Sequence, residues 1–158
     1  MDSEQLLILK AELQGQMRLI DRTLSRLQTR ANRGLDDPAL LDSIAYQIHN
    51  LYGSIEDLLK QIAIRFENRI SETSGWHRSL LLRLSQDIPG VRPALLSEDT
   101  FDLLNRLRGF RHFFRHAYDS EIEPSQLQAN LQIALAVVPK LREDVENFLG
   151  QLQLGVDG

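Results

Sequence analysis

The chain has 158 residues, and its 22 acidic residues outnumber its 18 lysines and arginines, for a formal net charge of −4. It has no cysteine, which excludes disulfides, thiolate metal sites and a cysteine nucleophile. It has neither the basic and apolar regions of a signal peptide nor an apolar run of the roughly 20 residues that span a bilayer. We therefore expect a soluble, cytoplasmic protein with no membrane contact, in which a single domain of residues 1–150 precedes a flexible tail of residues 151–158.

Leucine and isoleucine recur at intervals of three and four residues along most of the chain, and no stretch alternates as a strand does. With short connections between the apolar segments, this pattern predicts an all-α fold, an up-and-down antiparallel bundle of about five helices. The helices are expected over residues 3–31, 38–70, 76–85, 98–118 and 124–150. Residues 88–93, Ile-Pro-Gly-Val-Arg-Pro, are expected to form a loop.

Several of the expected helix ends carry a local signal. Asp37 precedes Pro38, which is the arrangement of a capping residue followed by a proline in the first helical position. Ser97 can cap the fourth helix in the same way. In the fifth helix, Pro139 predicts a bend and Gly150 predicts the end.

The expected fourth helix is basic. Between Arg106 and His116 it has four arginines, two histidines and no acid, which leaves 14 lysines and arginines against 22 acids elsewhere. At about 100° per residue, one side of this helix is apolar and should face the core: Leu103, Leu107, Phe110, Phe114 and Ala117, with Phe113 at its edge. The opposite side carries a basic strip, defined as Arg108, Arg111, His112, Arg115 and His116. Guanidinium groups match phosphate oxygens and imidazoles move protons near neutral pH, so the basic strip suits phosphodiester cleavage.

Other interpretations of this helix stay open. A row of arginines is often only a solvated helix face. His112 and His116, one turn apart, suit a metal ion, although no glutamate lies between them and no third ligand stands out. Phe110, Phe113 and Phe114 suit base stacking, but their position on the apolar side favours core packing.

Four polar residues outside the fourth helix receive no function. His49 and His77 are each alone on a helix and are interpreted as incidental polar residues. Glu56 and Asp57 are adjacent, so they point about 100° apart and cannot act as a facing carboxylate pair. Both are interpreted as surface charges.

The fourth helix resembles a known motif. Arg111-x4-His116-x-Tyr118, with the polar His112 directly after the arginine, resembles the Arg-x4-His-x-Tyr motif of HepT-like toxins, a branch of the HEPN superfamily of helical ribonucleases. Residues 46–63 resemble the second helix of that family, and the resemblance as a whole covers roughly Leu40 to Phe148. It implies a HEPN-like bundle with the motif near the end of a late helix.

The resemblance also implies an activity. HepT-like proteins are metal-independent endoribonucleases that need no cofactor and act as homodimers or as higher assemblies of dimers, with the two motifs meeting between subunits. By this resemblance, His116 acts as general base or acid on the ribose 2′-hydroxyl, and Arg111 stabilises charge on the scissile phosphate of the RNA substrate. Arg108, His112 and Arg115 would position backbone phosphates.

A protein partner is implied as well. In HepT-like systems, the cognate antitoxin is a minimal nucleotidyltransferase that transfers AMP to the motif tyrosine, so the resemblance makes Tyr118 the site of AMPylation. The alternative is a non-catalytic HEPN-like interaction module, whose basic strip only binds a nucleotidyltransferase partner or nucleic acid.

Overall fold

The structure is a computed structural model that describes residues 1–68, 74–116 and 121–158, and of residues 115 and 116 the backbone alone. Within these residues the chain is helical, apart from the connections and one isolated β-bridge between Ile88 and Arg92. The helices are α1 (Ser3–Ala31), α2 (Pro38–Glu67), α3 (Trp76–Leu84), α4 (Glu98–His116) and α5 (Pro124–Asp157). The prediction of an all-α fold with five helices is confirmed.

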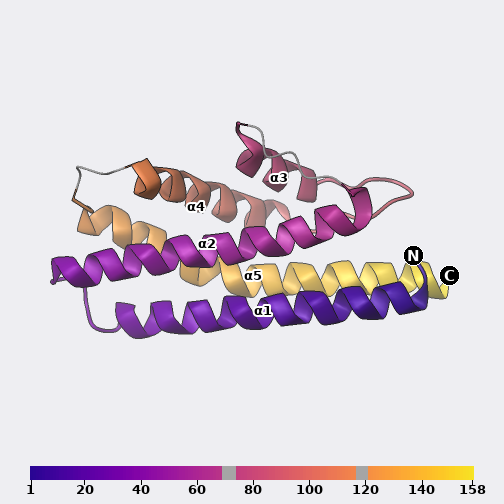
Figure 1. Ribbon diagram of the computed structural model, residues 1–158, viewed down its shortest axis with the longest axis horizontal. Coiled ribbons are helices and arrows are strands. Elements are labelled where there is room, and N and C mark those ends of the chain that lie inside the picture. The colour runs from indigo at the N-terminus through magenta and orange to yellow at the C-terminus, as the bar shows by residue number, and fades with distance from the viewer. Residues whose placement is uncertain (69–73, 117–120) are drawn as a thin grey trace.

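The three long helices lie lengthwise in the bundle, with both chain termini at the same end (Figure 1). α1 runs antiparallel to α2, and α4 runs antiparallel to α5, while the short α3 lies across the upper side in this view (Figure 1). α2 contacts each of the other helices, so it is the centre of the bundle. No helix of the described residues is long and apolar enough to cross a membrane.

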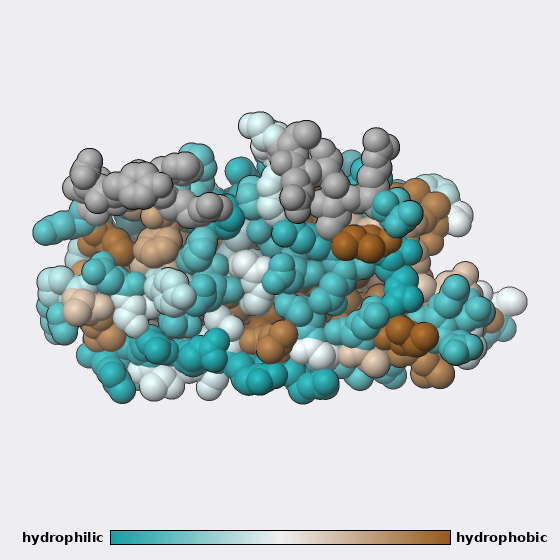
Figure 2. Space-filling view, in the orientation of Figure 1, coloured by the Kyte–Doolittle hydropathy of each residue, from teal (hydrophilic) through white to brown (hydrophobic). Residues whose placement is uncertain are grey.

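One contiguous core fills the space between the helices. α2 contributes most to it, because apolar residues recur along one side of all its turns and are fully buried: Ile44, Ile48, Leu51, Ile55, Leu58, Leu59 and Ile62. The face shown in Figure 2 is mainly hydrophilic, with separate hydrophobic patches. This division is the amphipathic pattern that the leucine and isoleucine spacing predicts.

Local capping explains why the helix ends were largely predictable. α1 ends at Ala31 as expected, and its start is held by a capping box in which the Asp2 carboxylate accepts a hydrogen bond from the Gln5 backbone N–H. Asp37 caps α2, with its carboxylate accepting from the Ala39 N–H at 3.0 Å. Ser97 Oγ accepts from the Thr100 N–H at the start of α4.

Two expected helix ends are wrong. α2 ends at Glu67 instead of near residue 70, because Asn68 adopts the left-handed conformation (φ 50°) that stops a helix and that asparagine tolerates. α5 does not stop at Gly150 but continues to Asp157. A glycine inside a helix costs only about 1 kcal/mol, and the flanking Leu149 and Leu152 pack against the core, which offsets that cost.

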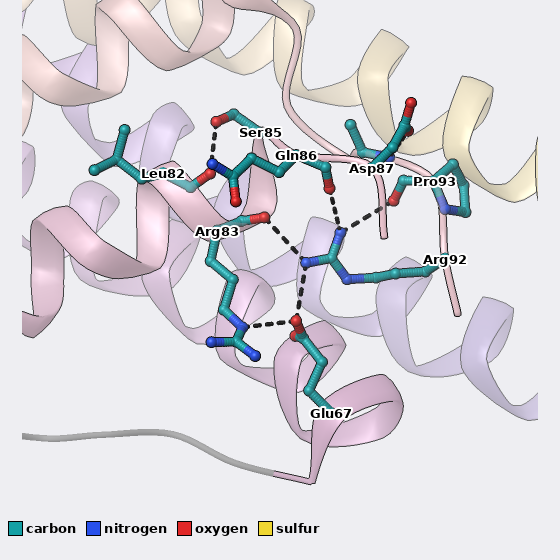
Figure 3. Close-up of polar contacts among 9 residues, drawn as sticks. Glu67, Leu82, Arg83, Ser85, Gln86, Asp87, Arg92 and Pro93 are labelled. Carbon is teal, nitrogen blue, oxygen red and sulfur yellow. Dashed lines mark hydrogen bonds and ion pairs between the residues drawn. The ribbon is translucent and has the colours of Figure 1, made fainter. Parts of the chain in front are cut away.

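The loop predicted at residues 88–93 is fixed by a buried arginine (Figure 3). The Arg92 side chain is fully buried and donates hydrogen bonds to the carbonyl oxygens of Arg83, Gln86 and Pro93. Its guanidinium lies 3.3 Å from Glu67 Oε1, and Arg83 Nε donates to the same oxygen at 2.6 Å (Figure 3). One carboxylate at the end of α2 thus holds both α3 and the loop that follows it.

Candidate functional site

The helix that carries the motif is anchored at its N-terminal end. Asp144 of α5 is largely buried, and its Oδ2 accepts hydrogen bonds from the Ser97 backbone N–H at 3.0 Å and from Ser97 Oγ at 3.1 Å. These bonds fix the start of α4 against α5. The basic strip lies toward the other end of α4, beyond Asn105.

The face that α4 buries is wider than the apolar side predicted from the sequence. Leu107, Phe110 and the partly buried Leu103 and Phe114 face the core as expected. Leu104 is also fully buried, although it lies four residues before Arg108 and therefore on the arginine side of the helix. For Arg108 and Arg111, the prediction that the arginines lie opposite the core is wrong, because α4 packs against α2 and α3 as well as α5. Arg108 and Arg111 instead border the core.

The two described arginines of the basic strip are half-buried. Arg108 donates from Nε and from its terminal nitrogen to the Asn105 side-chain oxygen, at 3.1 and 3.0 Å, so part of its guanidinium is held along its own helix. Neither Arg108 nor Arg111 forms an ion pair with a carboxylate in the described part of the chain. His112, the third predicted phosphate-binding residue described here, is exposed.

The remaining predicted site residues are described less fully. His116 is the last residue of α4, and the side chains of Arg115 and His116 lie outside the description. Tyr118 lies outside the described residues altogether. The catalytic assignment of His116, the metal alternative for His112 and His116, and the modification of Tyr118 therefore stay predictions.

Arg111 lines an open, polar hollow of about 450 Å³, which we call the α2 hollow. Residues of α1, α2, α3 and α4 surround it: Arg26, His49, Asn50, Gly53, Ser54, Glu56, Asp57, Lys60, Trp76 and Arg111. His49, which is interpreted above as an incidental polar residue, therefore lies in the same hollow as Arg111, and its ring also packs 5.4 Å from that of Phe114.

Glu56 is the main polar residue that the sequence interpretation missed. Its interpretation as a surface charge is wrong, because Glu56 is only 3% exposed and its Oε2 lies 2.6 Å from Nδ1 of His77. His77 is likewise not incidental, since it forms this pair from α3. A signal was present: Glu56 lies four residues after Tyr52 and three before Leu59, both fully buried, and so shares their side of α2.

The pKa of Tyr52 depends on the charged side chains of this region. Burial raises the pKa of its phenol well above the ordinary value, and the negative charge of Glu56 raises it further. The Tyr52 hydroxyl has no described hydrogen-bond partner with good geometry, so Glu56 acts on it chiefly through charge. The positive charges of Arg108 and Arg111 lower the same pKa. Both arginines are therefore within electrostatic reach of the Tyr52 side chain.

The three phenylalanines separate into two groups. Phe110 is buried and Phe114 packs against the core, with their rings 6.4 Å apart, so core packing is confirmed for both. Phe113 is 41% exposed and lies outside the core.

Most of the chain matches a known protein family. The family model described as a HepT-like protein matches residues 43–152, which include most of α2, all of α3 and α4, and most of α5. No curated protein matches the chain. The part of the chain that contributes most of the α2 hollow is thus also the part that the family model matches.

Proposed function

The chain belongs to the HepT-like family of the HEPN superfamily, and on that premise we propose that it is a metal-independent endoribonuclease, the toxin of a toxin–antitoxin pair. The observation that supports this most is the setting of Arg111, a half-buried guanidinium without a described carboxylate partner at the rim of a polar hollow. Such a group suits a phosphate, whose oxygens accept the forked donors of guanidinium.

In the proposed reaction the nucleophile is the substrate's own 2′-hydroxyl. His116 takes the proton from this hydroxyl, the 2′-oxygen bonds to phosphorus, and the bond from phosphorus to the 5′-oxygen breaks. A general acid protonates the leaving 5′-oxygen. Arg111 stabilises the negative charge that develops on the phosphate oxygens, and Arg108, His112 and Arg115 hold neighbouring phosphates. The products are a 2′,3′-cyclic phosphate and a 5′-hydroxyl.

Helix geometry favours a homodimer as the active form. Arg111 and His116 are five residues apart, so they project about 140° apart around α4. One copy therefore presents them on two flanks of the helix, and two copies facing each other would surround one phosphate with both residue types. In our proposal, the motif ends of two α4 helices meet in this way.

We propose that AMPylation of Tyr118 inhibits the cleavage of RNA. The partner is a minimal nucleotidyltransferase, which joins the Tyr118 phenol oxygen to the α-phosphate of ATP with loss of the phenol proton and release of pyrophosphate. The AMP group on Tyr118 is bulky and negatively charged, so it would occupy the place of an RNA phosphate and neutralise the arginines of the basic strip. Co-expression with such an enzyme should raise the mass of the chain by one or more AMP units, and Tyr118→Phe should abolish the gain.

The deciding experiment is cleavage of labelled single-stranded RNA by the purified protein in excess chelator. We expect cleavage with 2′,3′-cyclic phosphate ends, and its loss in His116→Ala. A requirement for added divalent metal would support the His112 and His116 ligand alternative instead. RNA that is bound but never cut would support the non-catalytic interaction module.

A further inference from the structure

The α2 hollow is lined by a glycine, Gly53, that the packing of the fold does not require. Gly53 lies in the middle of α2, where glycine costs about 1 kcal/mol relative to alanine. A Cβ added at Gly53 would meet no atom within 4 Å, so no neighbour in the described chain demands glycine there. The side chain that is missing at this position instead leaves the hollow open beside Arg111.

The cations of the hollow come from three helices that approach one another only in the folded chain. Arg26 lies on α1, Lys60 on α2 and Arg111 on α4, and none of the three forms an ion pair with a described carboxylate. Two acids also line the hollow, but Glu56 is already paired with His77. Asp57 is exposed and forms no ion pair in the described residues, so three cations face two carboxylates in that lining.

Trp76 orients one of these cations. The Lys60 ammonium lies 4.3 Å from the centre of the Trp76 ring, within the range of a cation–π contact. This contact holds Lys60 at the rim without consuming its hydrogen-bond donors, because an aromatic face accepts none of them in a fixed direction. The ammonium therefore stays available to an anion.

From these observations we infer that the α2 hollow binds one nucleotide of single-stranded RNA, the one next to the scissile phosphate. The inference rests on the proposed function, because it extends the RNA path from Arg111 into the hollow. The scissile phosphate lies at Arg111, the neighbouring phosphate lies at Lys60 and Arg26, and the sugar and base occupy the space above Gly53. The volume of about 450 Å³ is within the range of about 300–1,000 Å³ that small-molecule sites have.

The first test fills the hollow. Gly53→Leu and the matched variant Gly150→Leu both add a side chain at a helical glycine in open space, but Gly150 lines a different groove, between α1 and α5. Binding is measured by fluorescence anisotropy with a short RNA in which every ribose is 2′-O-methylated, so that no nucleophile is present. We expect Gly53→Leu to weaken binding about tenfold and Gly150→Leu to change it by less than about twofold.

The second test does not depend on how Gly53→Leu folds. In the double variant Arg26→Gln and Lys60→Gln, the slope of log Kd against log salt concentration should fall by about 0.7, because the two cations together hold one phosphate of the single strand. Lys10→Gln, at an exposed cation of α1 that lines the other groove, should leave the slope unchanged.

The outcomes separate the two proposals. If the wild-type protein cuts RNA but the double variant keeps its affinity and salt slope, the hollow is outside the RNA path and only this inference is overturned. If the wild-type protein neither binds nor cuts RNA, the proposed function is overturned together with it.

Discussion

α2 carries two acids with buried side chains, Glu56 and Glu67, and the cations near them are used differently. At the end of α2, Glu67 Oε1 receives both Arg83 and Arg92, and Arg92 also satisfies three carbonyl oxygens. In the middle of α2, Glu56 pairs with His77, while Arg111 lies at the rim of the same hollow without a described carboxylate partner.

The difference shows what decides the role of an arginine in this protein. A buried guanidinium with a carboxylate and several carbonyls has few donors left, and removing it would leave a buried charge behind. A half-buried guanidinium without a carboxylate keeps donors for a ligand and contributes little to folding. Arg92 is thus a structural residue, whereas Arg111 suits an anionic substrate.

The largest expected effect is on cleavage. Because Arg111 and His116 are assigned to the chemistry, Arg111→Ala and His116→Ala should each lower the rate of RNA cleavage by about 10²–10³-fold or more. The melting temperature, followed by circular dichroism, should change by less than about 2 °C for Arg111→Ala, since no described carboxylate loses a partner.

Arg83→Ala is the control, because Arg83 is an arginine of the same bundle that already has a carboxylate partner and does not line the α2 hollow. It should leave the cleavage rate within about twofold of the wild type, which is a free-energy change below 1 kcal/mol. If Arg111→Ala still cleaved RNA and Arg83→Ala did not, the assignment of Arg111 to the chemistry and of Arg83 to the structure would be wrong.

The next effect is on stability. Arg92→Met leaves Glu67 with one cation and leaves three carbonyl oxygens without their donor, so the free energy of unfolding in urea should fall by about 3 kcal/mol. The Arg83 side chain is 50% exposed, so Arg83→Met should lower the free energy of unfolding by less than about 1 kcal/mol. Equal losses for the two variants would mean that the burial of Arg92 is not what matters.

Alkaline pH tests the surroundings of Glu56. The pKa of Tyr52 is raised in the folded chain above the unfolded value of about 10, so its contribution is complete below pH 10 and is lost as pH rises further. One such group lowers the free energy of unfolding by about 1.4 kcal/mol per pH unit above about pH 10. Tyr52→Phe should remove this part of the slope, measured by urea unfolding between about pH 10 and 11.

Tyr46→Phe provides the comparison, since Tyr46 is on the same helix and is 54% exposed. We expect no change in the alkaline slope for this variant. A slope that Tyr52→Phe leaves unaltered would contradict the electrostatic description of Tyr52, Glu56 and the two arginines.

The smallest expected effect concerns two glycines. Gly53→Ala and Gly150→Ala should each raise the free energy of unfolding by up to about 1 kcal/mol, because both lie in open space within helices. Only Gly53→Ala should also weaken RNA binding, measured by anisotropy, since only Gly53 lines the α2 hollow. Loss of stability in Gly53→Ala would point to a packing role for this glycine.

Features fixed by neighbours in sequence were predictable. The start of α1, the cap at Asp37 and the start of α4 at Ser97 depend on side chains within three residues of the backbone groups that they satisfy. The end of α5 was not predictable in this way. Gly150 taken alone suggests the end of a helix, but the packing of Leu149 and Leu152 against the core lets α5 continue to Asp157.

The site was only partly predictable. Arg108, Arg111 and His112 could be placed on α4 by periodicity, but periodicity gives no information on which helices cover the flanks of α4. The burial of Leu104 and the pairing of Glu56 with His77 both depend on how α3 and α4 pack against α2. Contacts of this kind join residues far apart in the sequence, so local spacing indicates that Glu56 lies on the buried side of α2 but not that His77 is its partner.

The bonds between Ser97 and Asp144 give α4 the mechanics of a lever. Its pivot is at the N-terminal end, and Arg111 lies 14 residues beyond Ser97, about 21 Å along the helix axis. A rotation of about 3° at the pivot moves the guanidinium by about 1 Å, a displacement that can slow a catalysed step about a hundredfold. The stiffness of the bonds between one aspartate and a serine 14 residues from Arg111 therefore adds to the core packing of α4 in deciding how accurately the far end of the lever is aimed.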